Sequence, residues 1–409
     1  MDGANGMTYE ESLAWLYSTQ QIGIKLGLDN THRLLELLEI DPGDRTIFHV
    51  AGTNGKGSTC AFLESVCREA GLKTGLFTSP HLVSFRERIR IDFEPAPAET
   101  LAQILTRIRD EIQTWDPHPS FFEITTALGM RTFLDGGAEA IILETGLGGR
   151  LDSTNAVASS VTGITSISLD HQQWLGDSIA KIAEEKAGII KAGKPVVTVS
   201  SQDEDAAQVI RERAESLGSP LHIAPVYSGE TGICGEHQTA NAGLAARMIE
   251  VSPLNISASE VERGMAKAMW PGRFHRLEFQ GSPVIIDGAH NAEAAEALVR
   301  TWKAEFGDQK AAIVFGAVAD KEPQKLLKVL SPITGALFPT TIATQRGMTA
   351  DDLAKQIGES AQPAPSASLA LRLAQATQLP ILVTGSFFLA GQVLEVLGWG
   401  NADFEPSEQ

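Results

Sequence analysis

A short apolar run, a glycine-rich turn and a helical pattern follow one another early in the chain, and this arrangement constrains the fold most. Thr46–Ala51 (TIFHVA) is typical of a buried strand, and Gly52–Ser58 (GTNGKGS) is the turn. Glycines let backbone N–H groups close around phosphate oxygens, and the amino end of the next helix adds partial positive charge. The segment therefore predicts a phosphate loop. Lys56 would reach the outer phosphates of a nucleotide, with Ser58 or Thr59 beside a magnesium ion.

The loop departs from the usual G-x-x-x-x-G-K-[ST] pattern. Val50 stands where the first glycine belongs, and Gly57 separates Lys56 from the hydroxyl. A glycine-rich turn with an incidental lysine is the alternative interpretation, but the flanking strand and helix favour a phosphate site. A GTP-dependent switch normally carries an N-K-x-D segment that reads guanine, and the sequence has none.

Short apolar runs continue to alternate with helical patterns along the chain. Ala140–Glu144, Val161–Leu169 and Pro195–Ser200 are expected strands, the last after a helix at Ser178–Lys191. Alternation of this kind predicts an α/β fold with a mostly parallel sheet covered on both faces. Ligands bind at the carboxyl ends of the strands in such sheets.

A second domain is expected because 409 residues exceed what one compact core usually holds. Trp270–Phe274 (WPGRF) interrupts the pattern, and new expected strands follow at Val284–Ile286, Ala311–Phe315, Thr340–Ala343 and Ile381–Thr384. The sequence therefore predicts a P-loop ATPase-type domain at 1–272 and a smaller Rossmann-like α/β domain at 273–409.

Composition narrows the functional class. A net charge of −18 argues against a general nucleic-acid binder, which needs a basic surface, and means that an anionic substrate must meet local Lys, Arg or metal charge. No apolar stretch approaches the ~18 residues that span a bilayer, and the amino end lacks a signal-peptide pattern. Cys60, Cys67 and Cys234 fit neither a disulfide framework nor a zinc site. We expect a cytoplasmic protein without nucleic-acid or membrane partners.

Polar residues stand where several expected strands end. Glu144 precedes a glycine-rich loop and could hold Mg²⁺, which prefers oxygen ligands, although a solvated strand end is the alternative. Asp170-His171 follows another strand, where a metal or phosphate role and an ordinary loop pair both stay open. Asp287 could bind ribose hydroxyls, while Asn291 is expected to cap a helix.

Lys186 is the most informative single side chain. It shares one face of the Ser178–Lys191 helix with isoleucines, whereas Lys181 and Glu185 have the spacing of a surface i,i+4 pair. A lysine whose stem packs while its ammonium reaches water is one interpretation. The other is a desolvated lysine of lowered pKa, whose neutral amine serves catalysis or is carbamylated to a metal-binding carboxylate.

Nine segments together resemble the folylpolyglutamate synthase and dihydrofolate synthase family, a branch of the Mur-type ligases. They match in order across almost the whole chain, so the set is specific although no single member is. The segments are GTNGKGS (Gly52–Ser58), TSPHL (Thr78–Leu82), FFE (Phe121–Glu123), ETGLGGRLDSTN (Glu144–Asn155), SLDH (Ser168–His171), EEKAGIIK (Glu184–Lys191), PGRF (Pro271–Phe274), DGAHN (Asp287–Asn291) and TGSF (Thr384–Phe387).

The resemblance implies a role for each matching position. It implies ATP contacts from Thr53, Asn54, Gly55, Lys56, Gly57, Ser58, Asn241, Arg273 and Asp287. It implies two Mg²⁺ ions held by Ser79, Glu144 and His171, and catalytic roles for Lys56, His171 and a carbamylated Lys186. It implies pterin contacts from Ile24, Lys25, Leu26, Ser120, Phe121, Phe122, Glu123, Leu151, Asp152 and Ser153.

The family chemistry is the ATP-dependent addition of L-glutamate to a folate, or to dihydropteroate, through an acyl phosphate that closing domains would shield from water. Lys25 stands where bifunctional relatives often carry an acid, so the resemblance implies folate polyglutamylation more directly than use of dihydropteroate. It also implies a monomer. A Mur-type cell-wall ligase and a non-enzymatic P-loop NTPase switch are the alternatives. The former usually carries a UDP-sugar domain before its phosphate loop, and the latter needs no second α/β domain.

Overall fold

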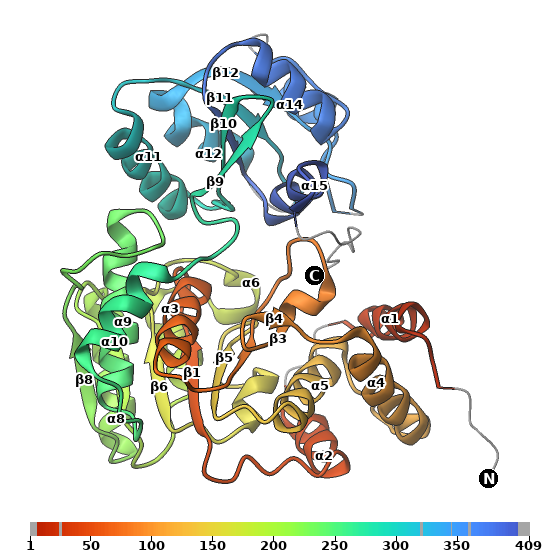
Figure 1. The fold of residues 1–409 in the computed structure, drawn as a ribbon, viewed down its shortest axis with the longest axis vertical. Coiled ribbons are helices and arrows are strands. Elements are labelled where there is room, and N and C mark those ends of the chain that lie inside the picture. The colour runs from red at the N-terminus through yellow and green to blue at the C-terminus, as the bar shows by residue number, and fades with distance from the viewer. Residues whose placement is uncertain (1–5, 24–26, 320–321, 345, 359–360, 400–409) are drawn as a thin grey trace. The chain divides into compact units, whose positions relative to one another are not determined.

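The computed structural model describes residues 6–23, 27–319, 322–344, 346–358 and 361–399. The chain forms two compact units, and each has its own sheet (Figure 1). The larger unit is built from the described parts of residues 1–79, 86–232 and 239–268, and the smaller from those of 80–85, 233–238 and 269–409. The predicted domain boundary after residue 272 remains a prediction. It lies close to Met269, where the last segment of the smaller unit begins.

The larger unit holds a sheet of order β4-β3-β2-β5-β1-β6-β7-β8 in the described residues. β2, β5, β1, β6, β7 and β8 run parallel, while β3 is antiparallel to β2 and β4 to β3. The strands are β1 (Thr46–Ala51), β2 (Thr74–Phe77), β3 (Ile89–Ile91), β4 (Glu94–Pro95), β5 (Ala140–Glu144), β6 (Val161–Ile164), β7 (Val196–Val199) and β8 (Leu221–Ala224).

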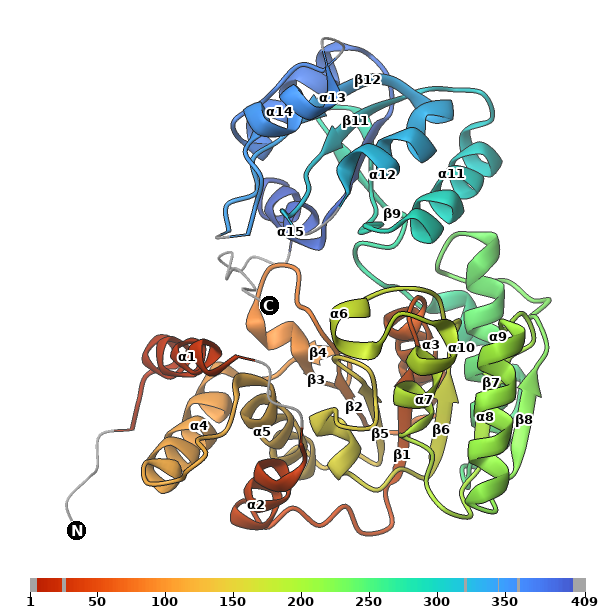
Figure 2. The same ribbon diagram turned by 180° about the vertical axis from the view of Figure 1, so that it is seen from behind.

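Helices cover both faces of this sheet, as expected for parallel strands buried on each side. Figure 1 shows α3, α9 and α10 on one face, and Figure 2 shows α7 and α8 on the other. The α-helices are α1 (Tyr9–Ser18), α2 (Asp29–Leu37), α3 (Lys56–Glu69), α4 (Ala98–Ile112), α5 (Phe121–Asp135), α6 (Gln172–Leu175), α7 (Ile179–Ala187), α8 (Glu204–Ser216), α9 (Glu236–Glu250) and α10 (Ala258–Lys267). The short 3₁₀ turns here are η1 (Thr19–Ile22), η2 (Phe85–Arg88) and η3 (Ser153–Ala156).

The smaller unit contains a sheet of order β12-β11-β13-β10-β9, in which β9 alone is antiparallel to its neighbour within the described part of the chain. Successive side chains of β10 alternate between two cores, with Val284 and Ile286 in one and Ile285 in the other. The strands are β9 (His275–Phe279), β10 (Ser282–Ile286), β11 (Ala311–Phe315), β12 (Thr334–Pro339) and β13 (Ile381–Thr384). The helices are α11 (Ala292–Phe306), α12 (Pro323–Leu330), η4 (Ser331–Ile333), α13 (Ala350–Ile357), α14 (Ala367–Ala376) and α15 (Phe387–Val396).

The structure confirms the predicted α/β fold class and corrects several boundaries. The expected strand Val161–Leu169 ends at Ile164, because the residues after it bond to the phosphate loop instead of continuing a ladder. The expected strand Thr340–Ala343 is wrong, since β12 covers Thr334–Pro339. Gly335 lies near the start of β12, and a glycine inside a strand weakens the sequence pattern from which a strand is predicted. The helix expected at Ser178–Lys191 is the shorter α7.

Two expectations from composition can be compared with the described residues. No helix among them is both long and apolar enough to cross a bilayer. Cys60, Cys67 and Cys234 are free thiols, and the first two are buried in α3. Burial raises the pKa of the Cys67 thiol to about 12, so this group packs as a small apolar side chain.

Candidate active site

The phosphate loop connects β1 to α3 and is fastened to the segment that follows β6. Thr53 N donates to Ser166 O at 2.8 Å, and Thr53 Oγ1 bonds both backbone groups of Ser168 at 3.1 Å. Gly52 has φ +150° and lies so close to Thr165 that a methyl group there would come within 1.7 Å of the Thr165 hydroxyl oxygen. These contacts explain why the loop needs glycine here and why β6 stops early.

The first turn of α3 offers unsatisfied polar groups to a ligand. The Ser58 and Thr59 hydroxyls are buried and form no hydrogen bond within the described residues. An unpaired buried polar group costs roughly 1–3 kcal/mol, so such a pair indicates a bound partner. Lys56 Nζ donates to the carbonyls of Gly52 and Thr53 at 3.0 and 3.2 Å. Hydroxyls, helix N–H groups and an ammonium suit a phosphate chain with a divalent cation.

Asn241 of α9, a predicted nucleotide contact, lies against Gly55 of the phosphate loop. A methyl group at Gly55 would lie 2.2 Å from Asn241 Oδ1, and the glycine has φ +92°. Asn241 is itself buried, so it has little freedom to move away. The predicted contacts Gly55 and Asn241 therefore lie together, although they are far apart in the sequence.

Gly55→Ala is expected to weaken ATP binding at least about tenfold, the effect of ~1.4 kcal/mol of misplaced contacts. Gly71→Ala is the matched control, because Gly71 also has positive φ, +78°, but has open space around its Cβ position. Both variants carry the conformational cost of a left-handed alanine, roughly 1–2 kcal/mol. Calorimetric titration with a non-hydrolysable ATP analogue measures the difference. Equal affinities in the two variants would contradict the close approach of Asn241.

Lys186 lies buried under the phosphate loop. Its Nζ donates to Gly52 O at 2.7 Å, and the residue is only 4% exposed. Burial, and next the charge of Lys56, lower the pKa of Lys186 to about 7. The prediction that Lys186 faces the core with isoleucines is confirmed, since Ile182 is fully buried beside it.

The predicted surface pair on the same helix is wrong. Lys181 Nζ contacts Asp177 at 2.8 Å, one turn earlier, and Glu185 contacts Arg150 at 2.8 Å. Asp177 precedes the helix at i,i+4 spacing from Lys181, whereas Arg150 comes from the loop after β5 and cannot be found from helical spacing. Arg150 N also donates to Glu185 O at 2.7 Å, so the loop after β5 is fixed against α7.

Two of the predicted metal residues meet at the carboxyl edge of the sheet. Glu144 ends β5, and its Oε2 accepts a hydrogen bond from Ser79 N at 3.1 Å, just after β2. The third, His171, lies at the start of α6 with its Nε2 3.9 Å from Asp170 Oδ2, and its side chain is half exposed. No cluster of three or more His, Cys, Asp or Glu side chains able to hold a metal occurs in the described parts of the chain. A divalent ion here would therefore need hydroxyls and phosphate oxygens as well.

Asp152, a predicted pterin contact, organises its own loop. Its Oδ2 accepts from Gly146 N at 2.9 Å and Leu147 N at 2.8 Å, and its Oδ1 accepts from Thr154 N at 3.1 Å. Burial raises the pKa of the Asp152 carboxyl, and the hydrogen bonds from Thr154 and the loop backbone oppose that rise. A pterin contact from Asp152, and from Leu151 and Ser153 beside it, remains a prediction.

The other predicted pterin segment begins α5. Ser120 and Glu123 form a capping box, in which Ser120 N donates to Glu123 Oε2 at 2.7 Å. Of the two aromatic residues between them, Phe121 is buried and Phe122 is partly exposed. Phe121 stacks on Tyr17 with ring centroids 5.8 Å apart, and the partly exposed Phe122 lies against Gly146 of the Asp152 loop. The remaining predicted contacts, Ile24, Lys25 and Leu26, lie outside the described residues.

Sequence reasoning missed Arg88 at this edge. Its side chain is fully buried, its guanidinium carbon is 5.4 Å from the Phe121 ring centroid, and burial lowers its pKa to about 10. Interactions with Tyr17 and with the carboxylates of Glu87 and Glu144 oppose this fall in the Arg88 pKa. The segment FRERIRI carries several arginines, and nothing in their spacing shows which of them the fold buries.

The predicted nucleotide residues of the smaller unit form a local group. The Asp287 carboxylate accepts hydrogen bonds from Phe274 N and Ala289 N, each at 2.9 Å. Burial raises the pKa of the Asp287 carboxyl, and the charge of Arg273 opposes the rise. The Arg273 guanidinium lies 4.6 Å from the Phe387 ring. Asn291 caps α11 through Ala294 N at 2.9 Å, which confirms its expected capping role.

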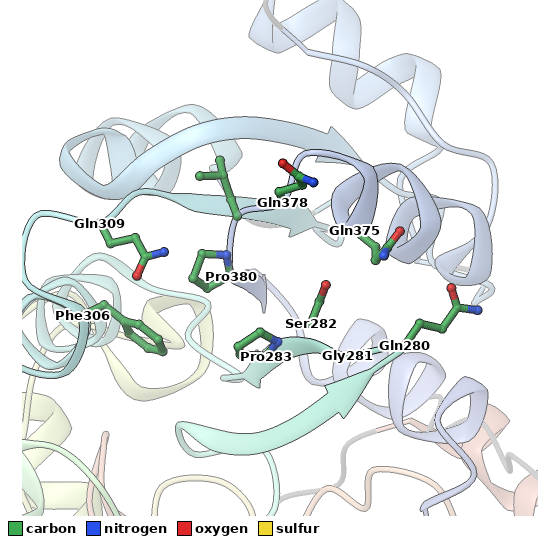
Figure 3. Close-up of a pocket in the computed structure, with 10 residues that line it drawn as sticks. Gln280, Gly281, Ser282, Pro283, Phe306, Gln309, Gln375, Gln378 and Pro380 are labelled. Carbon is green, nitrogen blue, oxygen red and sulfur yellow. The ribbon is translucent and has the colours of Figure 1, made fainter.

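A surface hollow of about 400 Å³ lies elsewhere in the smaller unit, at the amino ends of β10 and β13 (Figure 3). Asp287 follows β10 and Thr384 ends β13, so both lie at the opposite, carboxyl edge of the sheet. The hollow therefore does not coincide with the predicted nucleotide residues, and none of the described residues that line it is charged. Its lining consists of Gln280, Gly281, Ser282, Pro283, Phe306, Gln309, Gln375, Gln378, Leu379 and Pro380.

A phosphate loop with a buried lysine and a strand-end carboxylate, joined to a second α/β unit, defines a phosphate-loop nucleotide enzyme. Residues 272–387 match the family described as "Mur ligase, glutamate ligase domain". The chain is 37% identical over 379 residues to a dihydrofolate synthase/folylpolyglutamate synthase of Bacillus subtilis, covering 84% of this chain and 88% of that protein. It therefore belongs to the folylpolyglutamate synthase and dihydrofolate synthase family of Mur-type ligases.

Solved structures agree with this assignment. E. coli FolC in complex with DHPP and ADP superposes with a TM-score of 0.85 at 30% identity, over 96% of this chain and 99% of that one. A bifunctional folylpolyglutamate synthase/dihydrofolate synthase of Yersinia pestis, complexed with AMPPNP and a Mn ion, gives 0.83 at 32% identity, over 96% and 98%.

Proposed function

We propose that this protein is an ATP-dependent ligase that joins the amino group of L-glutamate to a carboxylate of a folate. The observation that carries the proposal is the convergence of Lys56 and Lys186 on the carbonyl of Gly52, at a phosphate loop in a chain whose relatives are glutamate-adding folate enzymes. The Lys56 ammonium places positive charge where phosphate transfer develops negative charge.

The reaction requires an activated carboxylate. A carboxylate oxygen of the acceptor attacks the γ-phosphorus of ATP, the bond to the β-phosphate oxygen breaks, and ADP leaves from an acyl phosphate. The neutral amino group of glutamate then attacks the acyl carbon, loses a proton and displaces inorganic phosphate. Lys56 Nζ donates to carbonyls of the phosphate loop. It would therefore stay close to the oxygens of the γ-phosphate while that group is transferred. The partly exposed Phe122 offers an aromatic surface for the pteridine end of the acceptor.

A divalent cation is part of the proposal, and the residues at the site fit one. Ser58 supplies a buried hydroxyl without a hydrogen-bond partner in the described residues, and Glu144 supplies a carboxylate at the adjoining strand end. When bound, such an ion neutralises phosphate charge during transfer. A second ion held with His171, as the family resemblance implies, belongs to the same proposal.

Carbamylation of Lys186 is a further part of the proposal. A lysine with a pKa of about 7 is partly a free amine at neutral pH. The free amine can add to CO₂, forming an N–C bond and releasing a proton, and the resulting carbamate carries negative charge. Such a group beside Lys56 would relieve the like-charge repulsion that lowers the Lys186 pKa.

ADP release should depend on both L-glutamate and a pteridine carboxylate. The assay contains ATP and Mg²⁺, with tetrahydrofolate in one arm and dihydropteroate in the other. We expect glutamate-dependent turnover with tetrahydrofolate, and turnover with dihydropteroate as well if the enzyme is bifunctional. Turnover in neither arm would refute the folate assignment. Stimulation by a cell-wall precursor instead would favour the Mur-type alternative. A cytoplasmic location and a monomeric state remain predictions from the sequence.

A further inference from the structure

A buried histidine stands in β1, directly before the phosphate loop. His49 is fully buried, and its Nε2 lies 2.8 Å from Thr154 Oγ1. Thr154 belongs to η3, which follows the loop after β5. A buried histidine in the middle of a mostly apolar strand needs a reason, because burying a polar side chain without a partner costs free energy.

The contact continues beyond Thr154 into the loop. Thr154 Oγ1 makes a short hydrogen bond with Asp152 Oδ1. Asp152 in turn accepts the backbone N–H groups of Gly146 and Leu147 through Oδ2. A hydrogen-bonded chain therefore runs from a core strand to the two residues that come second and third after Glu144.

The donors around Asp152 favour one direction of this chain. Three backbone N–H groups and the Thr154 hydroxyl lie at hydrogen-bond distance from Asp152, and these four donors stabilise its ionised form against the burial that raises its pKa. The single hydroxyl proton of Thr154 is thus given to Asp152, and its oxygen is left to accept a proton from His49 Nε2. His49 Nδ1, which forms no hydrogen bond within the described residues, is then the unprotonated nitrogen.

The charge state of the ring agrees with this arrangement. Burial, and next the charge of Lys191, lower the pKa of His49 to about 3, so the ring is neutral at physiological pH. Lys191 is itself engaged, since its Nζ donates to the Asn155 carbonyl and side chain at 2.7 Å. Asn155 Nδ2 donates to Arg150 O at 2.9 Å, so a second hydrogen-bonded chain also reaches this loop.

We propose that His49 is a positioning residue that, as an Nε2–H donor through Thr154 and Asp152, sets the conformation of the loop at residues 145–152. The proposal rests on the proposed function, because this loop follows Glu144 and lies against the partly exposed Phe122. The phosphate loop has its own anchors at Ser166 and Ser168. Disturbing His49 should therefore affect the folate acceptor more than ATP.

The matched pair His49→Gln and His49→Asn tests the position of the donor. The glutamine Nε2 reaches the place of the histidine Nε2, whereas the asparagine amide reaches only the place of Nδ1. We expect His49→Gln to keep kcat/KM for tetrahydrofolate within about threefold of wild type. We expect His49→Asn to lose about 10- to 100-fold, the range that small misplacements of a bound substrate produce. KM for ATP should change less than about twofold in both, since its anchors are separate.

Thr154→Val provides a second test that does not depend on His49 variants folding. Valine keeps the volume of threonine but cannot pass on a hydrogen bond, so its loss for tetrahydrofolate should match that of His49→Asn. Thermal melting of each variant separates this loss from general destabilisation. Equal kinetics for His49→Gln and His49→Asn, or wild-type kinetics for Thr154→Val, would overturn the proposal.

An activity-independent measurement separates the proposal from the proposed function. ¹⁵N NMR of histidine-labelled enzyme, assigned with His49→Gln, should show His49 protonated on Nε2 only and not titrating between about pH 5 and 8. Protonation on Nδ1 would overturn the proposal even in an active enzyme. A correct tautomer in an enzyme without glutamate-dependent ADP release would leave the loop role intact and refute the folate assignment.

Discussion

Replacing Lys186 with alanine is expected to lower kcat by about 10²- to 10³-fold, the usual effect of removing one preorganised charge or donor at a reacting group. The Lys186 Nζ lies 2.7 Å from Gly52 O of the phosphate loop, and the side chain is buried. The fold should survive, because removing a buried charge also removes its desolvation cost. Steady-state ADP release with saturating ATP, folate and glutamate measures the loss.

Lys181→Ala is the matched control for this experiment. Lys181 lies on the same helix, but it is exposed and pairs with Asp177 at the surface. A surface pair of this kind contributes about 0–1 kcal/mol to stability, so its loss should leave kcat near wild type. Near-normal kcat in Lys186→Ala would mean that the buried lysine serves the fold and not the reaction.

The pH dependence of the wild-type enzyme tests the carbamate within the same prediction. The folded pKa of about 7 lies below the ordinary lysine value of 10.5, so between these values the unfolded chain holds more protons. Stability from this group therefore rises with pH across that window, and the penalty is fully present below about pH 7. CO₂ reacts with the free amine, so stimulation of activity by bicarbonate should grow as pH rises through 7. Lys186→Ala should show neither trend.

The sequence predicted the parts of the site that depend on local pattern. A strand, a glycine-rich turn with a lysine and a helix predicted the phosphate loop, and helical spacing alone placed Lys186 with the isoleucines. Glu144 was placed at a strand end by its pattern, whereas Ser79 came from the family resemblance. The two meet because β5 and β2 are parallel neighbours, and such strands end at one edge of the sheet.

The contacts that depend on tertiary packing could not be predicted. Arg88 is one of several arginines in its segment, and only the packing of Phe121 and Tyr17 distinguishes it. The burial of His49 was visible in TIFHVA, but its partner Thr154 lies 105 residues away. Asp152 was predicted as a ligand contact from resemblance, while its carboxylate oxygens accept hydrogen bonds within its own loop.

Glu144→Gln is expected to lower kcat/KM for ATP by roughly 10²- to 10³-fold, the cost of losing several kcal/mol of metal-assisted charge stabilisation. The amide oxygen can still accept the Ser79 N–H that Glu144 Oε2 accepts at 3.1 Å, so the local fold should persist. What changes is the negative charge that a divalent cation requires. Binding of Mn²⁺, followed by electron paramagnetic resonance in the presence of an ATP analogue, should weaken in parallel with activity.

Glu139→Gln is the control that isolates this charge, because the two glutamates flank the same strand. Glu139 precedes β5, and its Oε2 accepts Lys73 N at 3.0 Å just before β2, as Glu144 accepts Ser79 N just after β2. The same substitution is thus made in the same kind of hydrogen bond at opposite ends of one strand pair. Only the carboxyl end should be sensitive, since ligands of parallel sheets bind there. Equal losses in both variants, or unchanged Mn²⁺ affinity in Glu144→Gln, would remove Glu144 from the metal site and leave the hydroxyls of α3 as its protein ligands.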